Sequence, residues 1–288
     1  MTDNRGLPSN LRSLEARIAN AATTRGRTLR RIQRVVANAV VGQMLPPGVV
    51  KGGTAMKLRV GEGGSRFTPD LDAVRASNLT LDDYLDDLAA RLAVGWSDFT
   101  GTVEELDPPR PEGVPDDYVM QPFALRMAYR GRHWLKVIFE LGHDEVGSTS
   151  THDERMPADI LGLFSELGLE TPAPIPVLAL DHQIAQKLHA CTSISPRTGG
   201  NERAHDLVDL QILEQEEHLD LAEIDATATR LFAARRQHAW PPVIVAHGGW
   251  ATIYAGAADG LDVRPEVDDA VTWANDFVGR IIESRGPS

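Results

Sequence analysis

The stretches KGGTAMKLR at residues 51–59 and RFTPDLD at residues 66–72 decide how this chain is interpreted. Two adjacent glycines, Gly52 and Gly53, let the backbone approach an anion closely. A helix that begins near Thr54 would direct its positive end at the same anion, and the Thr54 hydroxyl would add a donor. The first stretch therefore predicts a turn that binds phosphate groups.

Two carboxylates follow in the second stretch. Asp70 and Asp72 are two residues apart, so both point to one face of an extended strand while Leu71 points into the core. Such a pair can hold one or two hard divalent cations between the protein and phosphate oxygens. A Gly-Gly pair or an Asp-x-Asp pair alone is a weak signal, because many such pairs occur in surface turns. Their order and separation here strengthen the prediction of a nucleotide and metal site.

The order of these features resembles the start of the nucleotidyltransferase domain in the DNA polymerase β superfamily. Where that superfamily often has Gly-Ser, this chain has Gly-Thr, which retains the hydroxyl. The sequence KGGTAMKLR followed by RFTPDLD is similar to the motifs of one branch of this superfamily, the AbiEii/AbiGii nucleotidyltransferase toxins of bacteria. The resemblance implies an α/β (α+β) fold, in which a polymerase β-like domain with a mixed sheet precedes a C-terminal helical bundle.

Length and composition describe a soluble globular protein. The 288 residues are 42% hydrophobic and 24% charged, which suffices for one large domain or two ordinary ones. No stretch approaches the roughly 18 consecutive apolar residues of a membrane span, and no signal peptide is recognised. We therefore expect a cytoplasmic protein with no membrane partner. Cys191 is the single cysteine, which excludes an intramolecular disulfide.

The net charge of −12 argues against a protein whose whole surface binds nucleic acid, because phosphate neutralisation is the main source of that affinity. A local basic patch is still compatible with this charge. Five arginines near the N-terminus could contact an RNA: Arg25, Arg27, Arg30, Arg31 and Arg34. The alternative is a solvated arginine face on a helix, and the sequence leaves both open.

Two strands with alternating hydrophobicity are predicted at Phe123–Tyr129 and Trp134–Leu141, after an exposed connection at residues 103–121. Glu140 lies near the end of the second strand, where an unpaired buried carboxylate would be costly. In the superfamily, a third carboxylate on a neighbouring strand completes the metal site begun by the Asp-x-Asp pair. The resemblance implies this role for Glu140; a strand-end glutamate that faces water is the alternative.

Three prolines within residues 171–176 predict a stiff linker, because proline disfavours helix and fixes an extended path. We therefore divide the chain into a nucleotidyltransferase domain at residues 1–175 and a C-terminal helical domain at residues 176–288. Hydrophobic spacing predicts helices over residues 11–44, 81–92, 181–193, 203–213, 221–237 and 265–284.

A lysine occupies an informative position in the helix after the linker. Lys187 lies at the edge of the apolar stripe, while His182, Gln186 and His189 lie on the opposite, polar side. Such a lysine could simply extend along the core edge toward water. The sequence LDHQIAQKLHA at residues 180–190 resembles a second AbiEii signature, a helix with a lysine before Leu-x-Ala. That resemblance implies that Lys187 reaches the triphosphate or the acceptor oxygen and offsets developing charge.

The sequence RAHDLVDL at residues 203–210 resembles a third signature of the family, a basic residue followed by Asp-Leu-x-Asp-Leu. Asp206 and Asp209 are three residues apart and project from one side of a helix. One is implied to be a base for the acceptor hydroxyl, for which we favour Asp209, and the other a partner of Lys187 or Arg203. Both could instead be solvated helix acids.

The resemblance implies the toxin of a type IV toxin-antitoxin system, which transfers NMP from an NTP to an acceptor hydroxyl, with a tRNA 3′ end as the acceptor and a cognate antitoxin as partner. The residues fall into groups by role. Asp70, Asp72 and Glu140 bind Mg²⁺; Gly52, Gly53, Thr54, Arg66 and Asp206 bind the nucleotide; Asp70, Asp72, Lys187 and Asp209 are catalytic. The same fold could instead nucleotidylate a small molecule such as an aminoglycoside, or a protein side chain. A non-catalytic partner-binding protein is the remaining alternative.

Overall fold

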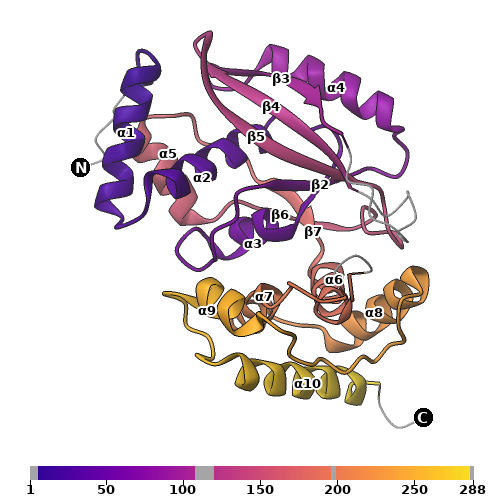
Figure 1. Cartoon of the computed structure of the whole chain (residues 1–288). Helices are drawn as coiled ribbons and strands as arrows, with labels where there is room; N and C mark the ends of the chain where they lie inside the picture. Colours follow the sequence, from indigo (N-terminus) through magenta and orange to yellow (C-terminus); the bar gives the residue numbers. More distant parts are fainter. Residues whose placement is uncertain (1–5, 108–119, 196–198, 286–288) are drawn as a thin grey trace.

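The computed structural model describes residues 6–107, 120–195 and 199–285 as a seven-stranded mixed sheet with ten helices. In Figure 1 the sheet and the N-terminal helices form the upper part of the molecule, and the last five helices lie below them. The predicted α/β (α+β) fold, a mixed sheet followed by C-terminal helices, is confirmed. Within these residues, none of the helices has the length and apolar character that crossing a bilayer requires.

The strands are β1 (Gly48–Lys51), β2 (Leu71–Arg75), β3 (Phe99–Glu105), β4 (Gln121–Tyr129), β5 (Arg132–Gly142), β6 (His152–Arg155) and β7 (Ile175–Leu178). The helices are α1 (Leu11–Thr24), α2 (Leu29–Gly42), α3 (Gly52–Val60), α4 (Leu81–Val94), α5 (Ala158–Leu167), α6 (Leu180–Thr192), α7 (His205–Glu216), α8 (Leu221–Arg235), α9 (Trp250–Ala258) and α10 (Val267–Glu283). Across the sheet the strand order is β3-β4-β5-β2-β1-β7-β6.

Three adjacent strands in the middle of the sheet carry the candidate site. Strand β2 runs antiparallel to β1 and parallel to β5. In this register Asp72 lies between Lys51 of β1 and Glu140 of β5. Because directly paired residues point to the same face of a sheet, the three side chains share one face.

The two faces of the sheet differ in what covers them. On one face, Leu71 of β2 and Phe139 of β5 are fully buried in a core that includes residues of α1, α2, α4 and α5. The ring of Tyr84 from α4 stacks on Phe139 with 6.5 Å between centroids. The opposite face carries Asp72 and Glu140, which the alternation of the strands turns away from this core. The alternation of hydrophobic and polar residues predicted for the strand at Trp134–Leu141 is thus observed in β5.

The C-terminal helices enclose a second hydrophobic core. The first core extends along the chain to Val177, and the second begins at Ile184, except that it also takes in Met56 of α3. The linker prolines lead directly into β7, which pairs with both β1 and β6. The predicted division between residues 175 and 176 therefore falls inside a strand of the sheet, and the two cores divide the chain after β7.

The single helix predicted over residues 11–44 is two helices, α1 and α2. Gly26 between them has a φ of 61°, a left-handed conformation that ends a helix. The Thr28 side chain then accepts a hydrogen bond from the backbone N–H of Arg31 at 3.3 Å, which caps the start of α2. Hydrophobic spacing continues across this turn, so periodicity alone does not reveal it.

Other predictions of secondary structure and of exposure also differ from the structure. The polar side predicted for α6 is wrong, because His182 and His189 are only 3% and 2% exposed in a helix that packs against α7 and α8. Part of the connection predicted at residues 103–121 belongs to β3, which pairs with β4, and residues 108–119 lie outside the described residues. Helices α5 and α9 are not anticipated by the periodicity.

Candidate active site

The Gly-Gly turn joins β1 directly to α3, whose first residue is Gly52. Gly52 has a φ of 63°, and a Cβ atom there would collide with the Asp72 carboxylate. A Cβ on Gly53 would lie 2.7 Å from the Thr68 hydroxyl oxygen. The glycines therefore allow Asp72 and the loop before it to pack against the start of α3. No side chain caps this helix end, so its first N–H groups are available to an anion.

The Thr54 hydroxyl has a different role from the one predicted. Thr54 is 2% exposed, and its Oγ1 donates to the backbone oxygen of Asp70 at 2.9 Å while it accepts from Asn38 Nδ2 at 3.1 Å. The hydroxyl is thus committed to holding α2, α3 and the start of β2 together. Phosphate binding by this turn would rest on backbone N–H groups, not on Thr54.

The carboxylates on the open face of the sheet repel one another. Burial raises the pKa of Asp72, and burial together with the charges of Asp72 and Asp70 raises the pKa of Glu140. Burial also raises the pKa of Asp70, although Arg34 and Arg30 oppose this. Among the described residues, none donates a hydrogen bond or forms an ion pair to these three carboxylates. They are therefore free to bind a ligand.

This donor set has the chemistry that Mg²⁺ prefers, because carboxylate oxygens are hard ligands and a bound cation would offset their mutual repulsion. Within the described residues, however, no group of three or more His, Cys, Asp or Glu side chains is arranged closely enough to hold a metal ion. Asp72 and Glu140 are paired across neighbouring strands, and Asp70 lies directly before the first residue of β2. The metal site stays a prediction.

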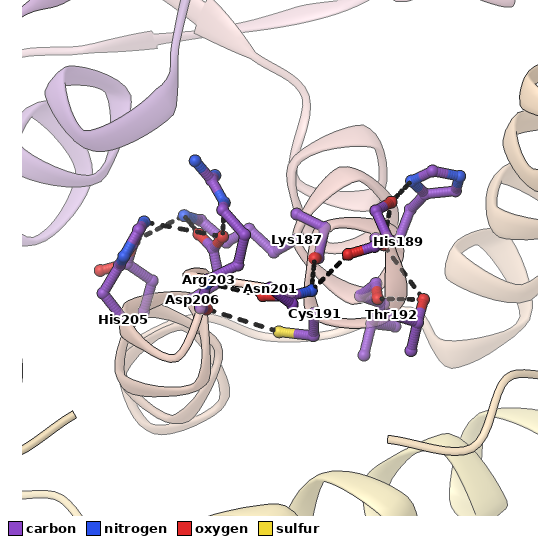
Figure 2. A network of polar contacts seen from close by, with 12 residues as sticks. Lys187, His189, Cys191, Thr192, Asn201, Arg203, His205 and Asp206 are labelled. Atoms are coloured by element: carbon purple, nitrogen blue, oxygen red, sulfur yellow. Dashed lines mark hydrogen bonds and ion pairs between the residues drawn. The ribbon is translucent and has the colours of Figure 1, made fainter. Parts of the chain in front are cut away.

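Lys187 from α6 binds both predicted aspartates of α7. Its Nζ is 2.9 Å from Asp206 Oδ1 and 2.6 Å from Asp209 Oδ2, and Lys187 is only 5% exposed. Arg203, just before α7, donates its Nε to the second oxygen of Asp206 at 2.7 Å. Figure 2 shows Lys187, Arg203 and Asp206 within this network. Neither aspartate is a solvated helix acid, because both side chains are 0% exposed.

Arg66, which was assigned to the nucleotide, instead extends the same network to the loop before β2. Its guanidinium binds Asp209 in a fork, with Nε 3.0 Å from Oδ1 and Nη2 3.0 Å from Oδ2. Burial alone would raise the pKa of both aspartates, but Lys187 and Arg203 lower that of Asp206, and Arg66 and Lys187 lower that of Asp209. Asp209 is therefore a poor general base in this arrangement, because it is inaccessible and weakly basic.

A cleft of about 220 Å³ lies between the open face of the sheet and the C-terminal helices. Acidic residues of the sheet and basic residues of both parts line it: Lys51, Asp72, Glu140, Lys187, Arg203 and Arg235. Gly52 also lines the cleft, whereas the buried Asp209 and Thr54 do not. The cleft therefore unites the Gly-Gly turn, two of the three predicted metal carboxylates and the predicted lysine.

Two basic residues that line this cleft were not among the site residues predicted from the sequence. Lys51 forms no hydrogen bond or ion pair with any described residue, although Asp72 is its partner in the β1–β2 register. Its position directly before Gly-Gly was the available signal. Arg235, in the last turn of α8, binds Glu145 through Nε at 3.0 Å and Nη2 at 2.7 Å. No local motif marks Arg235, which reaches the cleft only through the packing of the helices.

Comparisons with known proteins identify the family of this chain. A family model described as "Nucleotidyl transferase AbiEii toxin, Type IV TA system" matches residues 36–275. Among solved structures, the chain is similar to MenT4, a nucleotidyltransferase toxin from Mycobacterium tuberculosis, with 15% identity and a TM-score of 0.52 over 93% of this chain and 98% of that chain.

It also matches JHP933 from Helicobacter pylori, with 16% identity and a TM-score of 0.42 over 86% of this chain and 89% of that chain. A comparison with the curated proteins gives no match. At this identity the likeness to MenT4 shows a shared fold. Because the family model spans most of the sequence, the chain belongs to the AbiEii family of nucleotidyltransferase toxins of type IV toxin-antitoxin systems.

Proposed function

We propose that this protein transfers NMP from an NTP to the hydroxyl at the 3′ end of a tRNA in the cytoplasm, and that a cognate antitoxin protein restrains it. The observation that carries the proposal is the charge arrangement of the cleft. Unpaired carboxylates of the sheet, Asp72 and Glu140, line the cleft together with Lys187 of α6 and Arg203 just before α7. A metal-bound triphosphate carries the charges that complement both sides.

The sheet carboxylates are the residues that would hold Mg²⁺, with Asp72 and Glu140 as ligands and Asp70 beside them. When bound, this ion would neutralise phosphate charge and fix the orientation of the nucleotide. The N–H groups at the start of α3 and the ammonium of Lys51 are free to bind phosphate oxygens. Each of these groups lies beside Asp72, so phosphate binding and carboxylate binding would occur in the same cleft.

Transfer requires the acceptor oxygen to attack the α-phosphorus while the bond to the β-phosphate breaks and pyrophosphate leaves. Basic side chains of the cleft, Lys187, Arg203 and Arg235, would stabilise the negative charge of the leaving pyrophosphate. Asp206 and Asp209 act through Lys187, because their oxygens hold its ammonium in place. We therefore assign them positioning roles, and the free carboxylates of the sheet are the groups available to accept the hydroxyl proton.

The test is an acceptor screen with each of the four α-labelled NTPs, MgCl₂ and total tRNA. We expect the label to be transferred to tRNA. Reactions that contain EDTA, and reactions with tRNA whose 3′ ribose has been oxidised with periodate, should give no labelled tRNA. Asp72→Asn and Glu140→Gln should lose transfer, whereas Glu105→Gln, on an exposed position of β3, should retain it. Full labelling of periodate-oxidised tRNA would exclude the 3′ hydroxyl as the acceptor.

The same screen separates the alternatives. Label on an added aminoglycoside or on purified protein, with none on tRNA, would support a nucleotidyltransferase with another acceptor. If none of the NTPs raises the melting temperature in the presence of MgCl₂, a non-catalytic partner-binding protein is favoured, because a ligand that binds only the folded state must stabilise it.

A further inference from the structure

The five arginines near the N-terminus separate into two groups. Three of them pair with acidic residues of the same chain, which satisfies their charge. Arg25 is 3.1 Å from Glu166, and Arg27 is 3.5 Å from Glu62, which also binds Arg31. The charge of these three arginines is therefore offset by acidic side chains within the fold.

The other two, Arg30 and Arg34, have no acidic partner among the described residues. They are four residues apart on α2, where like charges repel and destabilise a helix. Burial and the charge of Arg30 both lower the pKa of Arg34, against the attraction of Asp70. In a protein with a net charge of −12, two neighbouring arginines without a carboxylate partner indicate a place for an external anion.

These arginines lie beside the candidate active site. Both act electrostatically on Asp70, and Arg34 Nη1 donates to the backbone oxygen of Lys136 in β5 at 2.7 Å. The exposed side chain of Lys136 lies on the same strand face as Glu140, four residues along β5. Arg30 and Arg34 therefore lie near Asp70, and Lys136 adds a third cation on the neighbouring strand β5, which Arg34 contacts. None of the three lines the cleft itself.

An aromatic ring accompanies these three cations. The guanidinium of Arg30 lies over the ring of Phe67, 5.6 Å from its centroid, and Phe67 is only half-buried. Basic groups that follow a backbone and an aromatic ring on which a base can stack are the combination by which proteins bind single-stranded nucleic acid. An acidic protein segment would use the charges but would have no need of the ring.

We propose that Arg30, Arg34 and Lys136, with Phe67, bind the single-stranded end of the RNA acceptor and lead its terminal hydroxyl past Asp70 into the cleft. This inference rests on the proposed nucleotidyl transfer to RNA and names the surface that receives the RNA. The nucleotide and the RNA are thereby separated: the nucleotide occupies the cleft, and the RNA backbone occupies the Arg30–Arg34–Lys136 surface on the Asp70 side.

The experiment measures binding of a short single-stranded RNA, labelled at its 5′ end, by fluorescence anisotropy over a range of NaCl concentrations without NTP. The variant is Arg30→Ala/Arg34→Ala. Each lost phosphate contact on a single strand lowers the slope of log Kd against log [NaCl] by about 0.7, so the double variant should lose about 1.4 and bind roughly tenfold more weakly at low salt. The increase in melting temperature caused by NTP and MgCl₂ should match that of the wild type.

The matched control is Arg91→Ala/Arg280→Ala, which changes the net charge equally at exposed arginines of α4 and α10. An Arg34→Lys variant, which keeps the charge, should retain most of the salt dependence. The inference is overturned if Arg30→Ala/Arg34→Ala keeps the wild-type slope, if the control loses as much affinity, or if the wild type binds an acidic peptide but no RNA. Failure of the proposed function would be seen separately, as a wild type that binds no NTP.

Discussion

Removal of the Lys187 ammonium tests whether this residue only assists transfer or also holds the C-terminal helices in position. Its Nζ lies 2.9 Å from Asp206 and 2.6 Å from Asp209, and both carboxylates are fully buried. Lys187→Met keeps much of the side-chain volume and deletes the charge. Each carboxylate then retains a single arginine, Arg203 for Asp206 and Arg66 for Asp209.

Removing one partner of a buried ion pair costs about 3–5 kcal/mol, because the remaining charge stays buried without full compensation. Since an arginine still contacts each aspartate, we expect the lower end, about 3 kcal/mol. For a domain of this size roughly 2–4 °C of melting temperature corresponds to each kcal/mol, so the melting temperature should fall by about 6–12 °C. Transfer to the acceptor should be lost as well, because Lys187 lines the cleft.

The pH dependence of the free energy of unfolding shows whether the deficit of Lys187→Met comes from lost charge or from lost packing. The neighbouring cations hold the pKa of Asp206 and Asp209 below the usual value despite burial. A carboxylate whose pKa is lowered by folding stabilises the protein above its unfolded pKa, which is about 3.9, and this contribution disappears as the pH falls through the folded value. The deficit of Lys187→Met should therefore be complete above about pH 5 and shrink as the pH falls below about 4.

Urea unfolding at neutral and acidic pH measures this deficit, with Arg91→Met as the control at an exposed cation of α4. If Lys187→Met lacks transfer but unfolds within about 1 kcal/mol of the wild type at neutral pH, Lys187 does not hold the buried aspartates as the structure indicates. A deficit that is equal at both pH values would point to lost packing instead of lost charge.

Three further predictions concern single positions. Gly52→Ala should cost about 1–3 kcal/mol and lower the transfer rate by about 100-fold, measured by urea unfolding and initial rates, because its φ is positive and Asp72 packs against it. Glu140→Gln should lose transfer yet melt at or above the wild-type temperature near pH 8; burial and the charges of Asp72 and Asp70 raise the pKa of Glu140, so its ionised form costs stability above that pKa. Cys191 is fully buried with a pKa raised well above the usual value, so iodoacetamide should modify it only in denaturant, as mass spectrometry will report.

The parts of the site that the sequence predicts are those formed by neighbouring strands. Gly52 and Asp72 lie on either side of one short helix and loop, so their approach follows from local chain geometry. Glu140 was singled out as a carboxylate at the end of an otherwise apolar strand, and its metal role was implied by the resemblance to the superfamily. The positions of these residues follow from the two-residue alternation of side chains along a strand and from short connections, both of which can be seen in the sequence.

The features of the site that the sequence does not predict depend on contacts that a side chain makes in the folded protein. The hydroxyl of Thr54 could bind a phosphate or a backbone oxygen equally well, and only the position of Asp70 decides. Likewise, the spacing of His182 and His189 indicates a polar face, but it does not record that neighbouring helices cover that face. Arg235 reaches the cleft by the same long-range packing.

The ion pairs that connect the two cores would make the C-terminal helices part of the proposed active site. Arg66, in the loop before β2, binds Asp209 of α7, and Asp209 binds Lys187 of α6. This chain of contacts fixes the position of Lys187 relative to the carboxylates of the sheet. Catalysis by charge stabilisation depends on cations that are in place before the reaction begins. We therefore propose that the buried aspartates serve the reaction by holding cations in the cleft, a role for which their low pKa is suited and for which proton transfer is not required.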